Sequence, residues 1–274
     1  MSQESQCNFQ FLDWDGQGYF AVPKLKEVQF PASPVKTPWT AWMAAFLQAT
    51  RGNFKFVGRL AELGGQVDGL VDKVCGELLG DACPDAVFPL LLERARLNDN
   101  CELTYEWCKA IATRGRLGDV PALLDAYEAN ITDIDDNPDI ILIYIDDMLV
   151  SDECSLPDPA ASGGVSGYRR AVEERCTQLL DRIGSEDVHL WRGEPTSVKR
   201  MAETLLALNP NRILPTHARR RFEASTGVNC KQMFAKNSKF LPLAAAAIAE
   251  DFLRSDGVDR YIEGSRYFFG HQVP

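Results

Sequence analysis

The sequence has few of the features that identify a catalytic or metal-binding protein. Its eight cysteines include no Cys-x-x-Cys pair, and its three histidines are far apart, with no partner at helical spacing. We therefore expect no metal site, and we expect Cys75, Cys108 and Cys176 to be core residues. No Gly-x-x-x-x-Gly-Lys-Ser/Thr segment is present to hold nucleotide phosphates. We expect no catalytic residues, no cofactor and no enzymatic activity.

Targeting and membrane signals are also missing from the sequence. The first seven residues are polar, and the longest apolar runs, such as residues 241–249, are far shorter than the ~20 residues of a membrane helix. With 45% hydrophobic and 25% charged residues, the composition is typical of a globular protein. We expect a soluble, cytoplasmic protein with reduced thiols and no membrane contact.

Positive charge is missing from one long segment, residues 117–168, which we call the acidic stretch. It contains twelve Asp and Glu residues and no Lys or Arg, whereas the whole chain has 39 acidic and 29 basic residues. Subtracting the twelve leaves 27 acidic residues against 29 basic ones, so the net charge of −10 comes from this stretch. Such a field attracts basic partners and repels nucleic acid and anionic lipid. The predicted partner is a basic protein and not a nucleic acid or a membrane.

Helical periodicity dominates the chain after Thr37, which we expect to cap a helix that begins at Pro38. Asp119 is expected to cap another helix, and short turns with Gly or Pro join about ten helices in all. This pattern predicts an all-α fold, an irregular HEAT-like helical repeat that forms an α-solenoid or a helical bundle. The expected helices cover residues 38–51, 54–63, 67–79, 84–97, 103–113, 120–128, 138–150, 168–183, 196–208, 214–225 and 242–253.

Four segments are expected along the chain. Residues 1–36 form an N-terminal extended segment with a short β-hairpin around the turn Asp15-Gly16-Gln17-Gly18. Residues 37–154 form the N-terminal helical repeats, residues 155–167 a linker loop, and residues 168–274 a C-terminal helical part packed on the first. Residues 212–239 are locally basic, and we expect them to face an acidic helix of the same molecule or solvent.

Two motifs within the acidic stretch resemble known metal sites. Tyr144-Ile145-Asp146-Asp147, after an apolar run, resembles the Tyr-x-Asp-Asp motif of reverse transcriptases, but the upstream aspartate and basic channel of that family are missing. The segment that begins at Asp133 opens like an EF-hand loop, yet Pro138 replaces the required Gly and Tyr144 the required Glu. We expect a helix with a solvated Asp pair and no calcium loop.

Mutual repulsion among twelve acids costs stability, so we expect the acidic stretch to be retained as a binding surface. Tyr127 and Tyr144 are candidate anchors for a partner on this surface. The partner-binding residues that we predict are Asp133, Asp135, Asp136, Asp139, Tyr144, Asp146, Asp147, Asp152 and Glu153.

The C-terminal third, in residues 221–227, 241–247 and 266–271, resembles the immunity proteins encoded beside bacterial polymorphic or type VI secreted toxins. Several of those proteins are HEAT-like. The resemblance implies a cytoplasmic, non-enzymatic protein that binds and neutralises a basic cognate toxin. Two alternatives are an adaptor or chaperone for a secreted effector, and a HEAT-like nucleic acid enzyme such as a DNA glycosylase. The enzyme needs a basic groove, which only residues 212–239 can supply.

Overall fold

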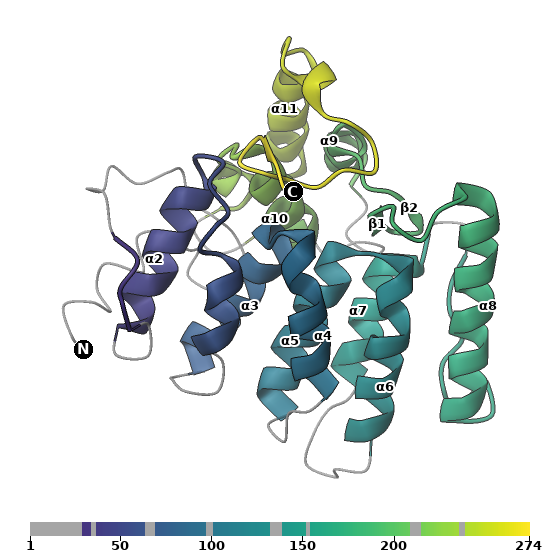
Figure 1. Cartoon of the computed structure of the whole chain (residues 1–274). Helices are drawn as coiled ribbons and strands as arrows, with labels where there is room; N and C mark the ends of the chain where they lie inside the picture. Colours follow the sequence, from purple (N-terminus) through teal and green to yellow (C-terminus); the bar gives the residue numbers. More distant parts are fainter. Residues whose placement is uncertain are drawn as a thin grey trace.

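Helices make up most of the regular structure in a computed structural model of the chain (Figure 1). The predicted hairpin around Asp15 lies outside the residues that the structure describes. No helix among the described residues is long and apolar enough to cross a membrane. The described residues are 29–33, 37–63, 69–96, 101–131, 139–151, 154–208, 215–235 and 239–274.

The first part of the chain forms a row of helices that stand side by side (Figure 1). Within the row α3, α5 and α7 pack in succession, while α4 and α6 pack on each other and on α5. The predicted all-α fold is confirmed, and a regular solenoid stays a prediction. The elements are α2 (Pro38–Ala49), η2 (Gly58–Leu63), α3 (Gly69–Ala82), η3 (Asp85–Val87), α4 (Phe88–Arg96), α5 (Cys101–Arg114), η4 (Leu117–Asp119), α6 (Val120–Asn130), α7 (Asp139–Leu149) and α8 (Val165–Ile183).

The C-terminal part lies above the middle of this row in Figure 1, over the upper ends of its helices. In it α9 packs on both α10 and α11, and α10 contacts α3. Two antiparallel strand pairs accompany these helices, with Leu190 opposite Pro195 in the first and Tyr267 opposite Gln272 in the second. The elements are β1 (Leu190–Trp191), β2 (Glu194–Pro195), α9 (Val198–Leu206), α10 (Pro215–Thr226), η5 (Lys231–Met233), α11 (Pro242–Leu253), η6 (Val258–Arg260), β3 (Tyr267–Phe268) and β4 (His271–Gln272).

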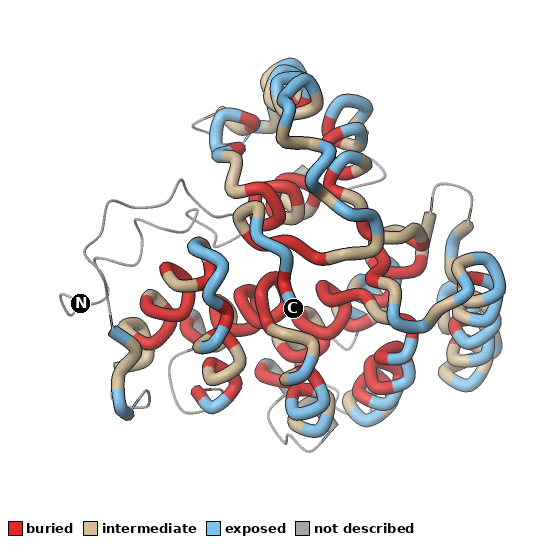
Figure 2. Tube along the Cα trace, turned by 45° about the horizontal axis from the view of Figure 1, so that its top comes forward, coloured by how far each residue is buried: buried red, intermediate tan, exposed pale blue. Residues whose placement is uncertain are grey.

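Apolar side chains are buried in two clusters (Figure 2). The larger cluster extends through the row of helices as far as Tyr168, Val172 and Leu179 of α8. The smaller cluster lies in the C-terminal part, around Trp191 and Phe222. The domain boundary at residues 155–167 stays a prediction, although α8, which follows that loop, shares the core of the helices before it.

The hairpin of β3 and β4 joins the two parts. Phe268 packs edge-on against Phe46 of α2, with ring centroids 6.2 Å apart. The backbone N–H of Phe269 donates to the carbonyl oxygen of Ala224 in α10 at 2.7 Å. The guanidinium of Arg266 donates to the carbonyl oxygen of Gly80 at 3.1 Å and to that of Cys83 at 2.6 Å. Residues 266–269 therefore contribute to the packing between the row of helices and the C-terminal part.

A charge network around Asp85 strengthens this junction. The carboxylate of Asp85 accepts hydrogen bonds from Arg114 Nε at 3.1 Å and from Arg266 Nη2 at 2.8 Å. His189 Nε2 lies 3.4 Å from the same carboxylate. Burial opposes ionisation of Asp85, but the hydrogen bond from His189 and the charge of Arg266 outweigh it and hold the pKa of Asp85 well below its usual value.

Four predictions about the helices were wrong in detail. Residues 54–57 form a turn, so the helix expected at 54–63 is reduced to the 3-10 helix η2. α3 continues through Gly80 and ends at Ala82. Gly80 instead allows α5 to approach closely, since a Cβ there would lie 2.8 Å from the Thr113 Cβ. Neither Thr37 nor Asp119 caps a helix with its side chain. The Asp119 carboxylate instead accepts from Arg114 at 3.0 Å.

Candidate functional site

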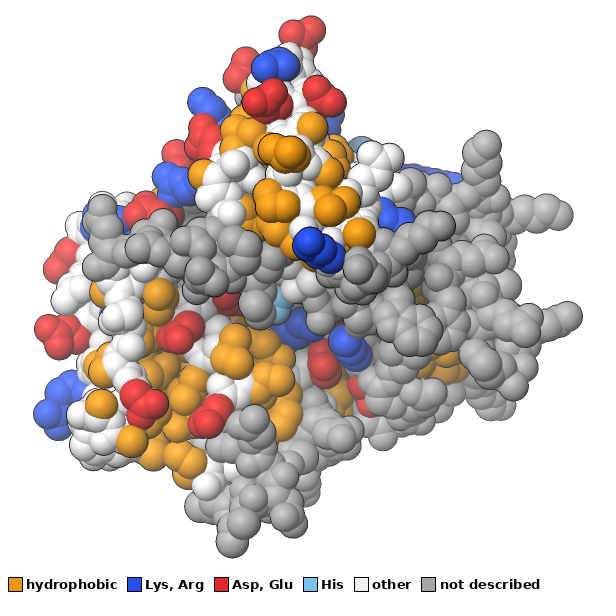
Figure 3. Space-filling model, turned by 180° about the vertical axis from the view of Figure 1, so that it is seen from behind, with side chains coloured by type: hydrophobic (Ala, Val, Ile, Leu, Met, Phe, Trp, Pro, Cys, Tyr) orange, Lys and Arg blue, Asp and Glu red, His pale blue; other side chains and the backbone are white. Residues whose placement is uncertain are grey.

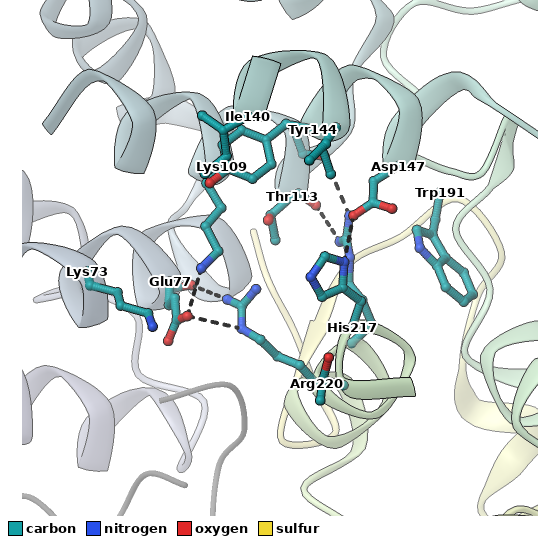
Figure 4. Close-up of a pocket in the computed structure, with 14 residues that line it drawn as sticks. Lys73, Glu77, Lys109, Thr113, Ile140, Tyr144, Asp147, Trp191, His217 and Arg220 are labelled. Carbon is teal, nitrogen blue, oxygen red and sulfur yellow. Dashed lines mark hydrogen bonds and ion pairs between the residues drawn. The ribbon is translucent and has the colours of Figure 1, made fainter. Parts of the chain in front are cut away.

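A cavity of about 240 Å³ lies where α7 and β1 meet α3, α5 and α10 (Figure 4). Its lining combines aliphatic and aromatic side chains with several charged groups, which is the usual make-up of a binding site. The lining residues are Lys73 and Glu77 of α3, Lys109, Ala112 and Thr113 of α5, Ile140, Ile143, Tyr144 and Asp147 of α7, Trp191 of β1, and Thr216, His217, Arg220 and Arg221 of α10.

Helix α7 supplies the cavity with one continuous face. Ile140, Ile143, Tyr144 and Asp147 follow the i, i+3, i+4, i+7 spacing that places side chains on one side of a helix. A different face of α7, which includes Ile145, is buried in the core. The apolar periodicity of the sequence thus fixes which side of α7 faces the cavity.

The acidic stretch meets the C-terminal part through Asp147 and His217. His217 Nδ1 lies 3.1 Å from Asp147 Oδ2, so the ring N–H donates to the carboxylate and joins α7 to α10. The two side chains are 38% and 41% exposed. A surface contact with that exposure contributes little stability, about 0–1 kcal/mol. The contact therefore shapes one wall of the cavity but adds little to the packing of α7 on α10.

Acidic groups of α3 hold the basic residues on the opposite wall (Figure 4). Arg220 Nη2 donates to Asp81 Oδ2 at 2.7 Å. Lys109 Nζ donates to Glu77 Oε1 at 2.8 Å, and Glu77 is 2% exposed. Arg221 Nη1 donates to the Thr113 carbonyl oxygen at 2.6 Å. Burial lowers the pKa of Arg221 to about 10.

The basic residues of α10 thus point into the molecule. Arg219 is 5% exposed, and its Nε donates to Glu223 Oε2 at 3.1 Å. Arg220 is 8% exposed. For Arg220, which binds Asp81 of α3, the expectation that residues 212–239 face an acidic helix of the same molecule is confirmed, whereas Arg219 binds an acid of its own helix. These two arginines are therefore not part of an exposed basic groove.

A second flank of α7 faces solvent beside the cavity, and we call Asp139, Ile143 and Asp146 the outer flank of α7. Asp139 and Asp146 are exposed, and the Ile143 side chain, which also lies at the cavity rim, is 49% exposed. From behind, the molecule has acidic side chains among apolar ones over the row of helices (Figure 3). Partial burial and the neighbouring Asp147 raise the pKa of Asp146 to about 6.

Other acids of the acidic stretch are compensated by bases from elsewhere. Arg169 of α8 lies 2.8 Å from Asp125 Oδ1 through Nη2 and 2.6 Å from Glu128 Oε1 through Nε. Arg114 of α5 binds Asp119, as described above. The view of the stretch as one uncompensated ridge is therefore wrong for these three acids, because their basic partners lie outside the stretch and, for Asp125 and Glu128, 44 and 41 residues away.

The structure brings together only part of the predicted partner-binding set. Tyr144 and Asp147 line the cavity, whereas Asp139 and Asp146 lie on the outer flank. The remaining predicted residues, Asp133, Asp135, Asp136, Asp152 and Glu153, lie outside the described residues. Sequence reasoning missed the cavity residues Lys73, Lys109 and Trp191, and no spacing in the sequence links them.

The Tyr-x-Asp-Asp segment lies within helix α7, as expected for a structural helix, and Asp146 and Asp147 point to different surroundings. The first half of the EF-hand-like segment, residues 133–138, falls outside the described residues. Among the residues with assigned positions, no group of three or more His, Cys, Asp and Glu side chains is arranged to hold a metal ion. Tyr127, the other candidate anchor, is 2% exposed and packs against the Tyr168 ring at 6.0 Å, so it is wrong as a surface anchor.

Comparison of the chain with protein-family models, with curated proteins and with solved structures gave no match.

Proposed function

We propose that the chain is a non-enzymatic protein-binding module whose partner docks on the outer flank of α7. The observation that carries this proposal is the exposure of Ile143, 49%, between the exposed acids Asp139 and Asp146. The three residues follow i, i+4, i+7 spacing and so share one side of the helix. An apolar centre within a charged rim is the composition of a protein interface.

The charge of the outer flank favours a basic partner. Asp139 and Asp146 belong to a stretch without Lys or Arg, and the opposite charge of a partner would steer its association. Together with the resemblance to immunity proteins, this charge leads us to propose a basic toxin domain as the partner. Binding would neutralise the toxin by covering its functional surface.

An adaptor or chaperone for a secreted effector would use the same flank and differs in its biological result. Loss of the outer flank would impair effector export in that case, instead of protection from poisoning. The nucleic acid enzyme is less well supported, because Arg219 and Arg220 are buried and hold acids of the same molecule.

Affinity capture from native lysate tests the proposal with a variant that carries Asp139→Asn, Ile143→Ser and Asp146→Asn. The matched control, Asp251→Asn with Asp256→Asn, removes two exposed acids from the C-terminal part instead. We expect the parent and the control to capture the same basic protein, with an affinity that falls as salt is added, and the variant to lose it. Equal capture by all three, with equal salt dependence, would show that the outer flank is not the binding surface.

A further inference from the structure

The cavity has a polar wall and an apolar wall, and this division identifies a class of ligand. We propose that the cavity between α7 and α10 binds a small organic anion with a flat apolar body. The cavity shares only Ile143, at its rim, with the outer flank of α7, and the proposal does not depend on the proposed protein partner.

The apolar wall suits an aromatic or other flat body. Ile140, Ile143 and Tyr144 approach from α7, and Trp191 approaches from β1 (Figure 4). Trp191 is 6% exposed and is fixed by the smaller apolar cluster, so its ring is preorganised. Aromatic side chains favour the faces and edges of other rings by about 0.5–1.5 kcal/mol beyond simple burial.

The polar wall favours a negatively charged group on the ligand. Lys73, Lys109, Arg220 and Arg221 line the cavity together with two carboxylates, those of Glu77 and Asp147. Four cations against two carboxylates give the lining an excess of positive charge. A carboxylate or phosphate monoester in the cavity would balance the excess charge.

The volume limits the ligand to a small molecule. At about 240 Å³ the cavity is below the ~300–1,000 Å³ of sites for drug-sized ligands. One or two fused rings with one acidic group fit this limit, whereas a dinucleotide does not. The excess of cations also disfavours a metal ion.

Calorimetric titration of the full chain with 2-naphthoate tests the proposal, with uncharged 2-naphthalenemethanol as the comparison ligand. We expect 2-naphthoate to bind more tightly. Lys73→Met should weaken its binding by about fivefold and leave the alcohol unaffected, since a partly exposed ion pair contributes up to about that much. Lys199→Met removes an exposed charge from α9, outside the cavity lining, and should change neither affinity.

Asp147→Asn should change the 2-naphthoate affinity in the direction opposite to Lys73→Met, which a merely structural effect would not do. It keeps the shape and the hydrogen-bonding oxygen of the side chain but removes a negative charge from the wall, so 2-naphthoate should bind about threefold more tightly. The proposal is wrong if the folded parent binds neither compound at millimolar concentration, or binds both equally. It is also wrong if Lys73→Met and Asp147→Asn shift the 2-naphthoate affinity in the same direction. None of these results bears on capture through Asp139 and Asp146.

Discussion

Replacing Asp85 with Asn should cost the fold a large part of its stability. The Asp85 carboxylate serves two buried guanidinium groups, those of Arg114 and Arg266, which are 3% and 6% exposed. Removing one partner from a buried ion pair costs about 3–5 kcal/mol, because the other charge stays buried. Here Arg114 keeps Asp119, and Arg266 keeps two carbonyl oxygens. With Asp85 itself 32% exposed, we expect a smaller loss, about 2–4 kcal/mol.

Urea unfolding followed by circular dichroism measures this loss at pH 7. Asp181→Asn, at an exposed site on α8, is the control and should change stability by less than about 0.5 kcal/mol. Because the pKa of Asp85 is lowered in the folded state, its contribution is complete above the unfolded pKa of about 4 and is lost as pH falls below it. The stability difference between parent and Asp85→Asn should therefore shrink in acid. A loss below about 0.5 kcal/mol at pH 7, within the range of ordinary surface substitutions, would refute this role of Asp85.

Two further substitutions test the packing and electrostatics of α3 and α7. Asp146→Asn should stabilise the fold by about 0.5–1 kcal/mol at pH 7 and by nothing below about pH 4, because the raised pKa disfavours its ionised form in the folded state. A gain that did not vary with pH would contradict this cause. Gly80→Ala should destabilise by about 1–3 kcal/mol in urea unfolding, since its Cβ would crowd Thr113 of α5. Gly257→Ala, with only the Ser255 Oγ at 3.9 Å, should be close to neutral, and equal effects of the two alanines would contradict the packing argument.

Local signals in the sequence were sufficient to locate most helices. Proline in the first turn marked the starts of α2 and α11, and the end of α11 matches the expected range. The helix expected at residues 138–150 is present as α7 (Asp139–Leu149), because helical periodicity is a property of neighbouring residues. Gly80 misled the prediction, since glycine stops a helix in some places and allows close packing of two helices in others.

The candidate site is formed by contacts between residues far apart in the sequence, which no local pattern predicts. Asp147 meets His217 across 70 residues, and Arg169 meets Glu128 across 41. No motif links such positions, so the acidic stretch seemed more uniformly charged than it is. The cavity was missed for the same reason, because its walls come from elements that only the tertiary fold brings together.

Hydroxyl-radical footprinting of the complex recovered by affinity capture tests the central claim most directly. The side chain of Ile143 is 49% exposed in the free chain, and Leu243 on α11, 88% exposed, is an internal reference outside the outer flank of α7. We expect the partner to protect Ile143 from oxidation and to leave Leu243 unchanged. Oxidation of Ile143 at the same rate in the free chain and in the complex would contradict a partner that docks on the outer flank of α7.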